Sequence, residues 1–127
     1  MKVLIKDTTI LSHSSPFHGL SKDILIEDGI ISEIGNKLDF SVDKIIEARG
    51  LHISCGWMDC FANFCDPGQE YKETLETGAN AAAAGGFTQV MLMPNTQPVV
   101  DNKSQVEYLV QKSRQLPVNV LPIGTVT

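Results

Sequence analysis

A change in hydrophobic spacing at Gly56 constrains the fold of this chain more than any other feature. Before it, apolar residues gather in short β-branched runs, "KVLIKDTTIL", "DILIEDGIISEIG" and "KIIEARGLHI". After it, two segments with helical spacing alternate with short apolar runs. The first pattern predicts an antiparallel sheet, and the order strand, helix, strand, helix, strand predicts a parallel sheet with right-handed crossovers. We therefore expect an α/β protein with a small β domain over residues 1–54 and an α/β domain over residues 55–127.

The dipeptide Asp28-Gly29 predicts the most specific local structure in the β part. It lies between two β-branched runs, and the two-residue turns of hairpins favour residues that tolerate positive φ. A tight antiparallel hairpin is expected here.

Two helices are expected in the second part. The segment "YKETLETGANAAAAGG" ends at Gly85-Gly86, where a left-handed residue can cap a helix. The second helix follows Asp101, which we expect to cap it, and Pro117 ends it. Helical spacing places on their buried faces Leu75, Ala79, Ala82 and Ala83 in the first helix and Val106, Leu109, Val110 and Leu116 in the second.

Composition narrows the classes of function. The chain has 127 residues, of which 43% are hydrophobic, and a formal net charge of −5. Its Lys and Arg residues form no cluster, which argues against a nucleic-acid partner, and no apolar run approaches the ~18 residues of a membrane span. We expect a cytoplasmic protein with no nucleic-acid partner and no membrane partner.

Cysteine and histidine spacing indicates no metal site. Cys55, Cys60 and Cys65 are evenly spaced, unlike the close pairs of structural zinc sites, and are expected to be free thiols. Along a strand, Cys60 points away from the face of the other two. The histidines are interpreted as surface or loop residues: His13, His18 and His52.

The stretches "GWMD", "DPGQEYKETLETGANAAAAGGFT" and "MPNTQPVVDN" together resemble the N-terminal part of dihydroorotase, a cyclic amidohydrolase of the amidohydrolase superfamily. The resemblance implies a fold in which a small antiparallel β domain precedes a (β/α)8 TIM-type barrel. A complete barrel takes about 250 residues. We therefore expect the barrel to be incomplete in this chain.

The metal motif of that family is degenerate here. The resemblance places two zinc-ligating histidines and a substrate-binding arginine where this chain has Phe61, Asn63 and Cys65. The i, i+2, i+4 spacing puts all three on one face of a strand. Phenylalanine offers a metal nothing, neutral asparagine is a poor zinc ligand, and cysteine cannot replace a guanidinium that binds a carboxylate. We expect no catalytic residue and no metal in this chain, although zinc is expected for active members of the family.

Asn95 matches the substrate-contacting asparagine of the family's "PNT" motif, so the resemblance implies a substrate-binding residue just past the second barrel strand. The alternative interpretation is an Asx turn before Pro98. Asp59 is interpreted as a buried carboxylate at a strand end, bonded to loop amides.

Two functions remain open. The resemblance favours a dihydroorotase-like pseudoenzyme, or its N-terminal portion, with a structural role in pyrimidine biosynthesis. Some members of the family without metal ligands are structural partners of aspartate carbamoyltransferase, which makes that enzyme the implied partner. The alternative is an active zinc-dependent cyclic amide hydrolase whose remaining site residues lie outside this chain.

Self-association is also expected. A three-stranded parallel sheet built on "QVMLM" and "VNVLPI" has unpaired strand edges and more apolar surface than two helices can cover. Such edges and faces pair with other chains.

Overall fold

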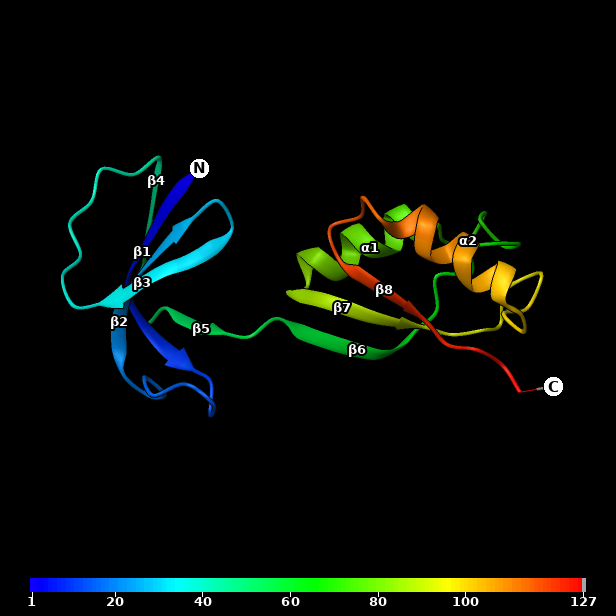
Figure 1. The fold of residues 1–127 in the computed structure, drawn as a ribbon, viewed down its shortest axis with the longest axis horizontal. Helices are drawn as coiled ribbons and strands as arrows, with labels where there is room; N and C mark the ends of the chain where they lie inside the picture. The colour runs from blue at the N-terminus through cyan, green and yellow to red at the C-terminus, as the bar shows by residue number, and fades with distance from the viewer. Residues whose placement is uncertain (127) are drawn as a thin grey trace. The chain divides into compact units, whose positions relative to one another are not determined.

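The computed structural model describes residues 1–126, which form two compact units that divide between Cys55 and Gly56. Each unit has its own sheet (Figure 1). Within the described residues, no helix is long and apolar enough to cross a membrane.

The first unit is a five-stranded sheet in the order β3-β2-β1-β4, with β5 also paired to β1. β1 is antiparallel to β2 but parallel to β4 and β5, so the expected all-antiparallel sheet is wrong for the last two strands. The chain reaches β4 through a longer connection, residues 36–43, which permits a parallel return, and β5 continues four residues later in the same direction along β1. The strands are β1 (Lys2–Leu11), β2 (Ser21–Glu27), β3 (Ile30–Gly35), β4 (Lys44–Glu47) and β5 (His52–Ser54).

The predicted hairpin is confirmed. Glu27 pairs with Ile30 across the turn between β2 and β3, and both turn residues have positive φ, 50° at Asp28 and 83° at Gly29. This is the turn geometry that matches the twist of the two strands.

The second unit is a three-stranded parallel sheet in the order β6-β7-β8, with a helix in each connection. Both helices lie on the same side of the sheet (Figure 1). The elements are β6 (Trp57–Ala62), α1 (Leu75–Ala84), β7 (Phe87–Leu92), α2 (Lys103–Ser113) and β8 (Asn119–Pro122).

The helix ends agree with the predictions at α1 and correct one at α2. Gly86, just after α1, has a φ of 86°, as expected for a left-handed cap. The residue that caps α2 is Asn102 and not Asp101: its side chain accepts a hydrogen bond from the Gln105 amide at 3.2 Å. Both residue types are good N-caps. Asn102 is the cap because its backbone is extended while the next residue is already helical.

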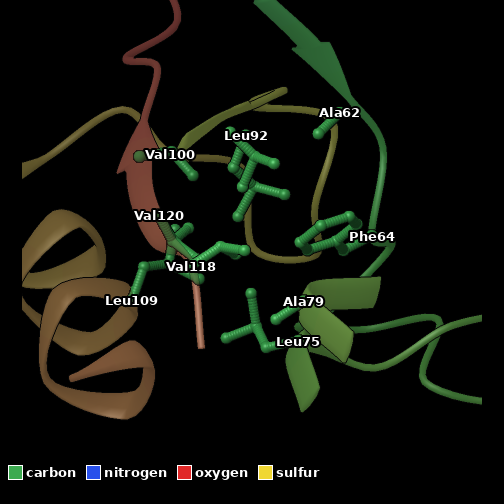
Figure 2. Close-up of a cluster of buried hydrophobic side chains, with 10 residues drawn as sticks. Ala62, Phe64, Leu75, Ala79, Leu92, Val100, Leu109, Val118 and Val120 are labelled. Carbon is green, nitrogen blue, oxygen red and sulfur yellow. The ribbon is translucent and has the colours of Figure 1, made fainter. Parts of the chain in front are cut away.

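One buried cluster joins the helices to the sheet (Figure 2). Figure 2 shows Leu75 and Ala79 of α1 and Leu109 of α2 directed toward side chains of the sheet. Val110 was expected on the buried face of α2, but it is 38% exposed. The cluster consists of Ala62, Phe64, Leu75, Ala79, Val90, Leu92, Val100, Leu109, Val118 and Val120.

The opposite side of the three-stranded sheet carries no helix. Val90 and Val120 are paired in register and point toward the helices, so their neighbours along the strands point away. We call this side the open face; register places on it Met58, Gln89, Met91, Asn119 and Leu121. Leu121 is 41% exposed, although parallel sheets are normally covered on both faces.

Candidate functional site

The candidate site lies at the carboxyl end of β6 and β7, where parallel α/β folds place their ligands. β6 ends at Ala62, so the prediction that Phe61, Asn63 and Cys65 share one face of a strand is wrong for the last two. Only Phe61 is in the strand, and its side chain is 71% exposed. Cys65, three residues past the end of the strand, has a left-handed conformation with a φ of 59°, so the extended path does not continue through it.

Asn63 and Cys65 contact each other instead of projecting in parallel. The Cys65 thiol lies 3.3 Å from Asn63 Oδ1, to which it donates, and 3.8 Å from the Asn63 carbonyl oxygen. The amide oxygen of Asn63, the atom best suited to a metal or a substrate, is therefore already engaged by a neighbouring side chain.

Asn95 is exposed in the loop after β7. Two backbone hydrogen bonds join this loop to the loop after β6, from Met93 to the Ala62 carbonyl at 2.9 Å and from Gln97 to the Pro67 carbonyl at 2.8 Å. The structure thus brings Asn95 to the same edge of the sheet as the three degenerate positions. At the turn itself, the buried Thr96 hydroxyl donates to the Pro98 carbonyl at 2.8 Å.

Asp59 is half-buried and not buried as expected. Its Oδ1 accepts a hydrogen bond from the backbone amide of Phe61 at 2.9 Å. The carboxylate is held within its own strand by a donor two residues away, and that contact involves no second titratable group.

The cysteines and histidines agree with their predictions. All three cysteines are free, and Cys55 and Cys60 are exposed. The three histidines are exposed and belong to the first unit. His52 lies in β5, where its Nδ1 is 2.8 Å from the Gly50 carbonyl oxygen.

An ion pair between a buried carboxylate and a lysine that is 39% exposed lies behind the site and was not predicted. Asp66, only 1% exposed, accepts hydrogen bonds from Lys112 Nζ at 2.7 Å and 3.0 Å, and from the backbone amide of Leu75 at 2.9 Å. Burial lowers the pKa of Lys112, but its hydrogen bonds to Asp66 and Tyr108 outweigh this and leave that pKa raised. Asp66 and Lys112 are 46 positions apart, so no local sequence pattern could have paired them.

The site residues do not fit the zinc that the family resemblance implies. Catalytic zinc takes three protein ligands from His, Cys or carboxylate groups. Phe61 has no atom that can ligate a metal. The Asn63 side-chain oxygen accepts a hydrogen bond from the Cys65 thiol. Among residues 1–126, no three His, Cys, Asp or Glu side chains are grouped to hold a metal.

Comparison with other proteins agrees with the fold. The structure superposes on the L-hydantoinase (dihydropyrimidinase) from Arthrobacter aurescens with a TM-score of 0.82 at 24% identity, over 96% of this chain and 27% of that one. A crystal structure of a dihydroorotase matches with a TM-score of 0.64 at 18% identity, over 97% of this chain and 31% of that one. Identities this low establish the fold: the N-terminal sheet and the first parallel strands of the hydantoinase type.

Sequence comparison gives the family. The dihydroorotase of Ruminiclostridium cellulolyticum is 43% identical over 100% of this chain, and that of Acetivibrio thermocellus is 45% identical over 98%. The family model described as dihydro-orotase-like matches residues 51–127. The chain belongs to this dihydro-orotase-like family of amidohydrolases. It spans 30% of the length of the R. cellulolyticum enzyme and 29% of that of A. thermocellus.

Proposed function

We propose that this chain is a dihydroorotase-like protein that contributes structure rather than catalysis. The observation that carries the proposal is the chemistry at the end of β6. Phe61 offers no ligand atom, and the Asn63 and Cys65 side chains are hydrogen-bonded to each other. Attack of water on a cyclic amide normally depends on a metal that lowers the pKa of the water and polarises the carbonyl. These three residues offer one thiol and neither a histidine nor a carboxylate, so they do not make the three-ligand set of a catalytic zinc.

The three-stranded parallel sheet is, in this proposal, the start of a (β/α)8 barrel. Its helices cover one face only, and the open face corresponds to the inward side of a barrel. The likeness to the A. aurescens hydantoinase supports this topology, since 96% of this chain superposes on 27% of that larger protein. In this proposal Asn95, in the loop after β7, is a substrate-contacting residue, because barrel folds bind their ligands at the carboxyl ends of the strands.

The cellular role that we propose is in pyrimidine biosynthesis, in the cytoplasm, with aspartate carbamoyltransferase as the partner. Support comes from the family and from its inactive members that serve as structural partners of that enzyme. The alternative function is a zinc-dependent cyclic amide hydrolase whose remaining site residues lie outside this chain. The 43% identity to a dihydroorotase favours that alternative.

A chimera separates the two functions. The matching 30% of the R. cellulolyticum enzyme is replaced by this chain, and zinc content and dihydroorotase turnover are measured. We expect the chimera to fold but to contain no zinc and to show no dihydroorotase turnover. The same chimera with Phe61→His, Asn63→His and Cys65→Arg is expected to regain zinc and activity. Turnover by the first chimera at the level of the parent enzyme, lost on chelation, would establish the hydrolase instead.

A further inference from the structure

Asp66 connects three separate parts of the second unit. Its own position is in the loop between β6 and α1. Oδ2 accepts the Leu75 amide at the start of α1, and both carboxylate oxygens accept Lys112 Nζ from α2. Since Asp66 is 1% exposed, its carboxylate depends mainly on these protein partners for hydrogen bonds.

Backbone hydrogen bonds join the residues after Asp66 both to Cys65, in the same loop, and to the loop after β7. The Gln69 amide donates to the Cys65 carbonyl at 2.8 Å, which closes the segment around Asp66. The Gln97 amide donates to the Pro67 carbonyl, also at 2.8 Å. Gly68 lies so close to Gln97 that a β-carbon on Gly68 would be 2.5 Å from the β-carbon of Gln97. A shift of Asp66 therefore moves the loop of Cys65 and, through Gln97, the loop of Asn95.

The other ion pair on α2 offers a contrast. Lys103 and Glu107 lie 3.3 Å apart on the exposed surface, where an ion pair contributes little. Lys112 is itself 39% exposed, but its partner Asp66 is only 1% exposed, so water and salt screen this pair less than the exposed one.

We propose that Asp66 and Lys112 are positioning residues: together they form a clamp that fixes the loops after β6 and β7 against α2. The clamp sets where Asn63, Cys65 and Asn95 stand at the mouth of the site. The inference deepens the proposed function, because these loops are the site that it describes. The clamp requires neither zinc nor turnover, so the clamp and the proposed function can each fail without the other.

Cys65 reports on the clamp directly. In a Cys55→Ser, Cys60→Ser background it is the only thiol, and it is half-buried next to Asp66. The rate at which a neutral thiol reagent labels Cys65 is measured at increasing urea. Faster labelling in Lys112→Met reports opening of the loop around Cys65.

We expect Lys112→Met to raise the labelling rate at least about tenfold, the factor that corresponds to 1.4 kcal/mol of easier opening. The rate should depend weakly on urea, because local opening exposes little surface. Hydrogen exchange at the Gln97 amide should accelerate in parallel. Lys103→Met, which breaks only the exposed pair, should change neither rate, and Lys112→Arg should retain most of the protection.

Three outcomes overturn the clamp. One is a labelling rate unchanged by Lys112→Met. Another is a faster rate that rises with urea as steeply as global unfolding does, which assigns the pair to general stability. The third is loss of the folded state in both Lys112→Met and the milder Lys112→Gln, as seen in the fluorescence of Trp57, which makes the pair a requirement for the whole unit.

Discussion

Gly68 packs against the backbone and the β-carbon of Gln97 and leaves no space between them for a side chain. A β-carbon at position 68 would lie 2.6 Å from the Gln97 carbonyl oxygen, and Gly68 also has a φ of 106°. Two separate costs thus meet at one residue, a backbone conformation that favours glycine and a steric contact between two loops.

Substitution of this glycine should show both costs. We expect Gly68→Ala to lower the free energy of unfolding of the second unit by about 2–4 kcal/mol, from left-handed strain of about 1 kcal/mol and overpacking of about 1–3 kcal/mol. Gly86→Ala is the control, because Gly86 has a φ of 86° and open space around it. It should cost only the strain. Urea unfolding followed by Trp57 fluorescence measures both, and equal costs would contradict the packing argument.

The hairpin turn predicts a second effect, this time of backbone conformation alone. Gly29 has a φ of 83° and no neighbour within 4 Å of an added β-carbon. Gly29→Val should destabilise the first unit by roughly 1 kcal/mol or more, because a β-branched residue is unfavourable at positive φ. Gly29→Asn, which tolerates that conformation, should cost less. Thermal unfolding by far-UV circular dichroism compares the two, and a midpoint unchanged in Gly29→Val would show that the turn does not constrain the strands.

The N-terminal amine makes stability depend on pH. A hydrogen bond from the Met1 amine to Asp28 raises the pKa of the amine and lowers the pKa of the Asp28 carboxyl. The raised pKa gives stabilisation that is complete below about pH 8 and lost as pH rises through the folded-state value. The lowered pKa gives stabilisation present above about pH 4 and lost as pH falls.

Asp28→Asn tests this pair and keeps a residue that suits the turn. Its unfolding midpoint should depend less on pH than that of the parent, both between about pH 7 and pH 10 and below about pH 4. NMR titration of the Met1 amine should also give a lower pKa in the variant. The same titration midpoint in both proteins would show that the contact is not formed in solution.

The open face predicts weak self-association through a second copy of the chain. It carries apolar Met91 and Leu121 beside the amides of Gln89 and Asn119, which both donate and accept, so the surface is complementary to itself. From strand spacing and rise, it measures about 14 Å by 20 Å. This is well below the ~800 Å² per partner of a stable interface. We therefore expect concentration-dependent association in the micromolar range or weaker.

Leu121→Asp should reduce this association. Val110→Asp, on α2, should not, although Val110 is nearly as exposed, 38% against 41% for Leu121. Sedimentation velocity over a range of concentrations measures the effect. A parent chain that stays monomeric and binds no apolar dye at micromolar concentration would rule out the second copy, and equal effects of the two variants would place the contact elsewhere.

Local patterns identified those elements whose geometry depends on neighbouring residues. The Asp28-Gly29 turn follows from the φ that each residue accepts. The burial of Leu75 and Ala79 follows from helical spacing. In the same way, spacing alone suggested that Val110 is buried. It is exposed because α2 packs on the sheet through a narrower stripe than its sequence offers.

Relationships between distant residues could not be predicted in this way. The shared strand face of Phe61, Asn63 and Cys65 was expected from spacing, but the strand ends at Ala62 and Cys65 has a φ of 59°. The next residue, Asp66, is paired with Lys112 of α2, the third element after β6. The choice between Asp101 and Asn102 as the cap of α2 likewise depended on the path of the preceding loop.

The backbone hydrogen bonds and the packing that join the two loops at the carboxyl end of the sheet come from residues other than Phe61 and Asn63. In an evolving lineage, shape and reactivity here are separate traits under separate selection. A mutation at position 61 or 63 can abolish chemistry without a penalty in folding, so it can persist wherever the assembled form alone is useful. A mutation at Asp66 has less freedom, because it would shift the loops and so change the shape itself, even in a lineage without catalysis.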